Sequence, residues 1–325
     1  MQSGREELVA IEQDVLKEAG FNLHLRAATQ MPEDVKMALR DIFQRETKKL
    51  PKYVLGKIIE NFEIAETKKM SICSDPGIPR FYVKVGNRAS IRNGFVGLEQ
   101  ALREATARAT REIPLRSNAV QPLSHENPAT NVGFFAPDIY YSFEPDADWI
   151  EITASHKGGF YGSDYRWLLP GDGIAGMKRF FLDVLSVNGR RGFACLPSVV
   201  GIGIGGNKDV SFRLAREAVT LRRVGDRHPD STVADFEEEL KALANSTMFG
   251  AMGLWGDITV MDVHIEIAHG HTGGPPMSIH QHCNAVRRAT VRIDSENRIE
   301  YRDQPEWFTS YYRRQNTAWK AEEDQ

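Results

Sequence analysis

Apolar residues recur every three or four positions along much of the first 69 residues of the chain. In the segment PEDVKMALRDIFQRETKK, Val35, Leu39 and Phe43 fall on one side of a helix whose first turn accommodates the leading proline. Residues 53–67 repeat the pattern. We therefore expect a helical N-terminal region over residues 1–69.

Alternating apolar and polar residues later in the chain predict strands in RFYVKVG, DIYYSFE, DWIEITAS, DITVMDVHIEI and ATVRIDSENRIEY. The three residues between DIYYSFE and DWIEITAS suggest a hairpin. Helical patterns cover residues 95–111, 209–222 and 233–245, the last with Ser231 or Thr232 as its N-cap. Because strands and helices do not alternate strictly, the pattern favours an α+β fold, with mixed, largely antiparallel strands packed with helices, over a doubly wound sheet.

The composition is that of an ordinary globular protein, since 41% of the 325 residues are hydrophobic and 26% are charged. We expect one domain over residues 1–325, made of the helical region 1–69, a core at 70–305 and a tail at 306–325. A net charge of -3 does not favour a nucleic-acid partner. No apolar run reaches the roughly 20 residues that span a membrane, and the N-terminus has no apolar secretory core. These features predict a cytoplasmic protein.

The chain contains three cysteines, Cys73, Cys195 and Cys283, which cannot all pair and should be reduced in the cytoplasm. Their number alone favours three inert buried thiols. Each, however, lies in a Gly- or Pro-rich segment beside polar residues: ICSDPG, ACLPSVVGIGIGGN and HQHCNAV. Three thiolates from separate loops suit a cubane iron–sulfur cluster whose fourth iron has no protein ligand. Such an iron is a Lewis acid that can bind a hydroxyl and a carboxylate oxygen.

Other interpretations of the same segments remain open. Five of the nine histidines lie between residues 264 and 282. A zinc site from His269, His271, Cys283 and another ligand is chemically possible, although the spacing matches no zinc-finger or zincin pattern. The glycines after Cys195 match a dinucleotide fingerprint only loosely. Asp75 either caps the Asp-Pro-Gly turn or shares a site with the preceding cysteine.

Together, the motifs resemble the class I fumarase and L(+)-tartrate dehydratase family, specifically its α subunit or N-terminal half. The resemblance extends over about residues 31–290. It rests on CSDPG followed by FYVKVG, on PLRSNAV, KGG, CLPSVVGIGIGGN and RHP, and on HIEIAHGHTGGPPMSIHQHCNAVRR, in this order.

The resemblance implies a hydro-lyase that reversibly adds or removes water on a small hydroxy-dicarboxylic acid, such as fumarate or malate, tartrate or a bulkier analogue. It implies that the three cysteines bind a 4Fe-4S cluster and that Asp75 and His271 are catalytic. The substrate-binding residues it implies are Arg116, Ser74, Gly158 and Gly159.

The sequence departs from the family pattern at two places. Ser74 and Pro76 replace a glutamine and a threonine that usually flank the family's first aspartate, which removes an amide, a hydroxyl and a backbone donor. Phe160 and Tyr161 add bulk in the loop that follows Lys157. These changes favour a larger or less polar acid than fumarate or tartrate.

In this family a β subunit or a C-terminal half completes the site, including the group that abstracts the proton. The resemblance therefore implies a separate β partner, low activity of this chain alone, and a dimer or heterotetramer with a shared site. The alternative from another class is a non-catalytic or regulatory protein in which an iron–sulfur cluster or zinc serves structure or sensing.

Overall fold

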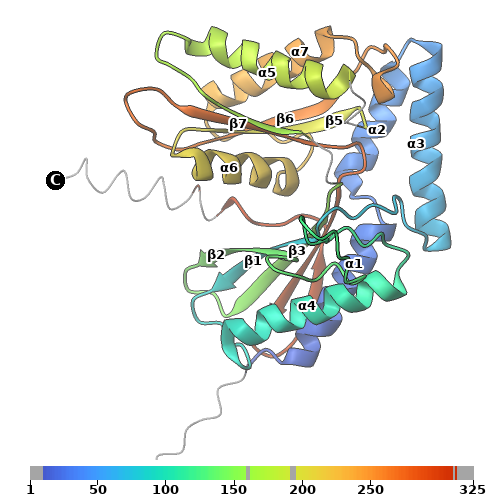
Figure 1. Cartoon of the computed structure of the whole chain (residues 1–325), viewed down its shortest axis with the longest axis vertical. Coiled ribbons are helices and arrows are strands. Elements are labelled where there is room, and N and C mark those ends of the chain that lie inside the picture. Colours follow the sequence, from blue (N-terminus) through green and yellow to red (C-terminus); the bar gives the residue numbers. More distant parts are fainter. Residues whose placement is uncertain (1–9, 159–161, 191–194, 310–311, 313–325) are drawn as a thin grey trace, which may run out of the picture. The chain divides into compact units, whose positions relative to one another are not determined.

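The computed structural model describes residues 10–158, 162–190, 195–309 and 312, and these fall into two compact units (Figure 1). Unit 1 consists of Met1–Ala28, Ser74–His156 and Arg288–Gln325, and unit 2 of Thr29–Cys73 and Lys157–Arg287. Each unit is thus assembled from segments that are distant in the sequence. The single domain over residues 1–325 stays a prediction.

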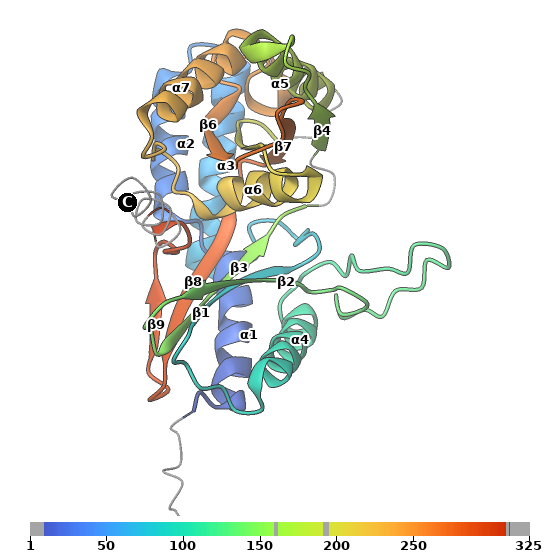
Figure 2. The same cartoon turned by 90° about the vertical axis from the view of Figure 1, so that its left-hand side faces the viewer.

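Unit 1 is a five-stranded sheet with two helices against one face (Figure 2). The strand order is β2-β1-β3-β8-β9. The elements are α1 (Gln13–Thr29), β1 (Arg80–Gly86), α4 (Gly94–Glu112), β2 (Asp138–Glu144), β3 (Trp149–His156), β8 (Arg287–Asp294) and β9 (Ile299–Arg302). Apolar side chains of α1 and α4, among them Leu23 and Leu102, pack with Phe81 of β1 and Ile152 of β3 into one buried cluster.

The predicted hairpin of DIYYSFE and DWIEITAS is wrong, because β1 lies between these two strands. β2 pairs in parallel with β1, placing Ile139 opposite Phe81, and β3 pairs with the other edge of β1 in antiparallel fashion. β1 is buried along nearly its whole length, whereas β2 is half-exposed. The more apolar strand therefore takes the interior position, which the short connection between β2 and β3 does not reveal.

Unit 2 is a four-stranded sheet of order β4-β7-β5-β6 between helices. Its elements are α2 (Glu33–Arg45), α3 (Lys49–Lys68), β4 (Ser163–Trp167), α5 (Gly173–Arg190), β5 (Ser198–Ile204), α6 (Lys208–Leu221), α7 (Ser231–Ser246), a 3-10 turn (Ala251–Gly253), β6 (Val260–Ile267) and β7 (Pro276–His282). Side chains of α5 and α7 pack on Val200 and Ile202 of β5. α6 covers the opposite face, as Figure 1 shows.

The glycines that follow Cys195 allow α6 to approach β5 closely. A Cβ atom on Gly203 would lie 1.9 Å from the carbonyl oxygen of Ser211, and one on Gly201 would lie 2.1 Å from that of Ala215. At such distances only glycine fits without moving the helix. Helix–strand packing therefore accounts for these two glycines without a bound nucleotide.

The predicted α+β class is confirmed: the N-terminal part is helical, and the strands are mixed, with β1–β3, β4–β7, β5–β7 and β8–β9 antiparallel and β1–β2 and β5–β6 parallel. The predicted N-cap of α7 is wrong. Asp230, rather than Ser231 or Thr232, accepts the backbone N–H groups of Thr232 and Val233, because its carboxylate precedes the first helical residue.

One helix of the structure was not predicted, and one predicted segment lies mostly outside the described residues. α5 has no counterpart among the predicted helices. Most of the predicted tail over residues 306–325 lies outside the described residues, because the structure describes only residues 306–309 and residue 312 of this segment. Among the described helices, none is long and apolar enough to cross a membrane.

Candidate functional site

All three cysteines belong to unit 2, and each lies in a loop, as expected. Cys73 follows α3, Cys195 precedes β5 and Cys283 follows β7. Cys73 is exposed, Cys195 is partly buried and Cys283 is 4% exposed. The group therefore reaches from the surface of the unit into its core.

The segment that follows Cys283 holds the loops of the other two cysteines. The backbone N–H of Asn284 donates to the carbonyl oxygen of Cys195 at 2.9 Å. The guanidinium of Arg287 donates to the carbonyl oxygen of Cys73 at 3.1 Å, across 214 positions of sequence. One five-residue segment, 283–287, thus carries one cysteine and is hydrogen-bonded to the other two.

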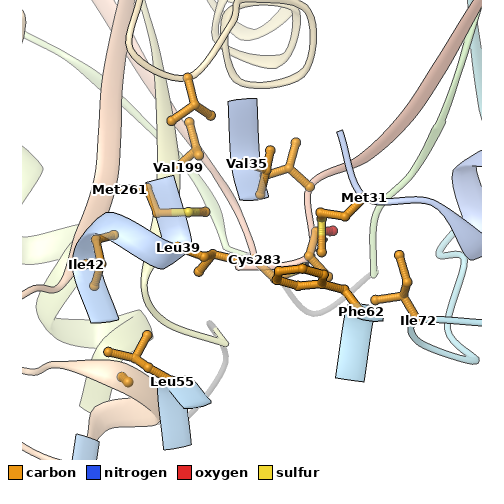
Figure 3. Packing of buried hydrophobic residues seen from close by; sticks show 14 of the residues in the cluster. Met31, Val35, Leu39, Ile42, Leu55, Phe62, Ile72, Val199, Met261 and Cys283 are labelled. Carbon is orange, nitrogen blue, oxygen red and sulfur yellow. Dashed lines mark hydrogen bonds between the residues drawn. The ribbon is translucent and has the colours of Figure 1, made fainter. Parts of the chain in front are cut away.

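The surroundings of Cys283 are apolar (Figure 3). Its side chain lies in a buried apolar cluster with Leu39 of α2, Phe62 of α3, Met261 of β6 and Met31, which lies two residues before α2. Cys195 packs against the same cluster. Burial raises the pKa of the Cys283 thiol, and the positive charge of Arg287 opposes this rise.

No group of three or more His, Cys, Asp or Glu side chains within the described residues is arranged to hold one metal ion. A single zinc would require sulfur ligands within about 4 Å of one another, since Zn–S bonds are about 2.3 Å. A cubane cluster instead binds each cysteine to a different iron and accepts a wider spacing. The described residues therefore give no support to a zinc site made of His269, His271 and Cys283.

In unit 1, Asp75 is held by several donors. One of its oxygens, Oδ1, accepts the backbone N–H of Gly77 at 2.8 Å and the side-chain amide of Asn118 at 2.7 Å. Its other oxygen lies 3.7 Å from the guanidinium of Arg116, whose own backbone N–H donates to the carbonyl of Ser74 at 2.7 Å. Asp75 therefore caps its turn and also faces Arg116, while its sharing of a site with the preceding cysteine stays a prediction.

Asn131, which is fully buried, holds the loop that carries Arg116 in place through hydrogen bonds. The side-chain oxygen of Asn131 accepts the backbone N–H groups of Asn118 and Ala119, and its amide donates to the carbonyl of Arg116 at 3.0 Å. Sequence reasoning missed both asparagines. Asn118 lies inside the PLRSNAV motif, whereas no sequence signal marks Asn131.

His271 lies in the loop between β6 and β7 of unit 2 and is exposed. Its ring nitrogen Nδ1 accepts the backbone N–H of Gly273 at 2.9 Å. A backbone N–H can only donate, so the neutral ring carries its proton on Nε2. His271 therefore presents a hydrogen-bond donor, rather than an acceptor, to whatever it faces.

Of the remaining predicted site residues, some lie within the described part of the chain and some outside it. Ser74 is exposed and Gly158 is buried. Gly159, Phe160 and Tyr161 lie outside the described residues. The structure thus brings Ser74, Asp75 and Arg116 together in unit 1, and the three cysteines together in unit 2.

Comparison with known proteins gives a consistent result over most of the chain. Residues 18–292 match the family model described as fumarate hydratase (Fumerase). A putative L(+)-tartrate dehydratase subunit alpha from Methanocaldococcus jannaschii is 42% identical over 282 residues, which cover 85% of this chain and 97% of that protein. The L(+)-tartrate dehydratase subunit alpha of Escherichia coli strain UTI89 is 32% identical over 290 residues, 88% of this chain and 93% of that one.

Proposed function

Because the chain belongs to the fumarate hydratase (Fumerase) family, we propose that it is the α subunit of an iron–sulfur hydro-lyase. The enzyme would reversibly add or remove water on a small hydroxy-dicarboxylic acid. The single observation that best supports this proposal is the hydrogen bonding of the Cys73 and Cys195 loops to the segment that carries Cys283. Three thiols held in this way, with one facing an apolar cluster, fit a cofactor with several metal atoms.

Cys73, Cys195 and Cys283 would hold a 4Fe-4S cluster, whose iron without a protein ligand supplies Lewis acidity toward the substrate hydroxyl when the cluster is bound. The apolar lining around Cys283 fits this group, since an apolar shell limits solvent access to a bound metal centre. Retention of the cluster depends on reducing conditions, so we also propose a cytoplasmic location.

The polar residues would bind and orient the substrate. Arg116 would take a substrate carboxylate through paired charge-assisted hydrogen bonds, and its exposed side chain is open to such a ligand. Asp75 would hold that guanidinium in place and manage the proton of the substrate hydroxyl. His271 would donate from Nε2 to a substrate oxygen, as its hydrogen bond from Gly273 requires.

The partner we propose is a separate β subunit, because the two relatives compared above are both described as alpha subunits. It would complete the site, supply the group that abstracts the proton, and assemble with this chain as a dimer or heterotetramer. This chain alone should then retain its cluster but show almost no turnover. Full activity of the purified chain without a partner would refute this division of labour.

The substrate is proposed to be bulkier or less polar than fumarate or tartrate. Exposed Ser74 offers a shorter polar group than the glutamine usual in the family, and the sequence adds Phe160 and Tyr161 beyond Gly158. The test is an anaerobic activity screen of this chain co-purified with a β subunit. Fastest turnover on a substituted dicarboxylate supports the proposal, whereas clearly fastest turnover on fumarate or L(+)-tartrate contradicts it.

A further inference from the structure

Arg287 heads the largest fully buried side chains of the described chain, with 1% of its surface exposed. It lies four residues after Cys283, and its guanidinium donates to the carbonyl oxygen of Cys73. A long charged side chain is seldom buried so completely unless its charge is used. No role was expected for it from the sequence.

Two physical effects of Arg287 act on different cysteines. Through its hydrogen bond it holds the loop of Cys73, the most exposed of the three thiols. Through its position it places a buried positive charge in the same five-residue segment that carries Cys283.

A cluster bound by three thiolates in apolar surroundings carries net negative charge, which is costly to bury without a cation nearby. The buried guanidinium supplies that charge from inside the protein, where solvent screens it least. The same guanidinium donates from Nη1 to the carbonyl oxygen of Cys73, so one side chain provides both the charge and the position of the loop.

We infer that Arg287 is a positioning residue for the cluster, which holds the Cys73 ligand loop through its carbonyl oxygen and offsets the negative charge of the bound cluster. This inference rests on the proposed function. The two effects can be separated, because lysine retains the charge at this position but lacks the planar fork of arginine.

The experiment compares Arg287→Lys and Arg287→Gln with wild type after anaerobic reconstitution with iron and sulfide. Arg288→Gln is the matched control, because Arg288 is the adjacent buried arginine, 5% exposed, and donates instead to Gln304 at 2.8 Å. Three quantities are measured: iron bound per chain, the rate of iron loss to a chelator, and the midpoint potential of one-electron reduction by dithionite, followed by EPR.

Both Arg287 variants should lose iron about tenfold faster than wild type or more, as expected when a hydrogen bond from a charged donor is lost. Arg287→Gln should also shift the midpoint potential to more negative values, since reduction adds negative charge that the guanidinium no longer offsets. Arg287→Lys should keep a potential near that of wild type. Arg288→Gln should resemble wild type in all three quantities.

Hydrogen exchange of the metal-free protein separates this inference from the proposed function. Backbone amides of residues 70–77 should exchange faster in both Arg287 variants and at the wild-type rate in Arg288→Gln. If wild type binds no iron, the proposed function fails, whereas hydrogen exchange still tests whether Arg287 holds the Cys73 loop. Wild-type exchange and wild-type iron loss in Arg287→Lys would overturn the inference, even if Arg287→Gln failed to fold.

Discussion

The candidate functional residues of the two units are built in different ways. In unit 2, Cys73 and Cys195 are held through their main-chain oxygens, and Cys283 faces a buried apolar cluster. In unit 1, Asp75 is held through its carboxylate, whereas the Arg116 side chain remains 58% exposed. The cysteine group thus reaches into an apolar core at Cys283, whereas Arg116 is open to solvent.

This difference indicates two kinds of ligand. A buried, apolar setting strengthens electrostatic interactions and excludes water, which suits a group that stays bound through many turnovers. An exposed guanidinium beside a carboxylate that hydrogen bonds hold in place suits a ligand that binds and dissociates in each turnover. Under the proposed function, the cofactor would bind in unit 2 and a substrate carboxylate would contact unit 1. The following experiments test this division in order of expected effect.

Replacing a cluster ligand should have the largest effect. Cys283→Ser should abolish binding of stoichiometric iron and lower turnover of the complete enzyme by about a thousandfold or more, because the Lewis acid contributes several kcal/mol. Iron analysis and steady-state kinetics measure the two effects. Met261→Leu, a volume-conserving change in the same apolar cluster, is the control and should retain iron.

Replacing the carboxylate contact should affect substrate binding and leave the cofactor in place. Arg116→Ala should raise KM about 10- to 100-fold through loss of hydrogen bonds to a charged group, with unchanged iron content. Arg111→Ala, another exposed arginine of unit 1, should be neutral. Loss of iron in Arg116→Ala would contradict the claim that Arg116 binds substrate without helping to retain the cofactor.

The cysteine-bearing unit should also be sensitive to packing beside β5. Gly203→Ala should lower the free energy of unfolding by about 1–3 kcal/mol, because the new methyl group would lie 1.9 Å from the Ser211 carbonyl oxygen. Gly171→Ala, where nothing lies within 4 Å, should change stability by less than about 0.5 kcal/mol. Denaturant titration compares them, and equal stabilities would contradict the close approach of α6.

The stability of unit 1 should instead depend on pH in the acid range. His24 Nδ1 lies 2.8 Å from His156 Nε2, and His24 Nε2 lies 3.0 Å from the Thr106 hydroxyl, whose proton is donated to the carbonyl of Leu102. The neutral ring of His24 therefore donates from Nε2 and accepts at Nδ1. Burial lowers the pKa of His24 from 6.5 to about 4.

A depressed histidine pKa means that the unfolded chain binds the proton more readily. The stability contributed by neutral His24 is thus complete above pH 6.5 and is lost as the pH falls toward 4, by at most about 3 kcal/mol. Denaturant titrations at several pH values should show a shallower acid loss in His24→Asn than in wild type. If stability depended on pH in the same way in wild type and in His24→Asn, the acid loss could not be assigned to His24.

The elements that sequence predicted well are those whose signal is local. The 3.6-residue apolar period located α2, α3 and α4, and the turn-rich segments located all three cysteine loops. Resemblance to a family, rather than spacing, linked the cysteines to one another and to Arg116.

What sequence did not predict depends on long-range contacts. The place of β1 between β2 and β3 is a matter of which strand is most buried, and Asp230 caps α7 through the geometry of its turn. Asn131 and Arg287 act on residues 12 to 214 positions away, so no local pattern marks them. Single polar residues with such roles become visible only when the chain is folded.

The most direct test of the account is the metal content and spectrum of the anaerobically reconstituted chain. If the three cysteines hold the cluster, the protein should be brown and contain about four irons and four sulfides per chain. It should lose one iron in air and gain the EPR signal of a 3Fe cluster. A colourless protein with one bound zinc, or brown protein whose iron persists after Cys73, Cys195 and Cys283 are all replaced by serine, would contradict it.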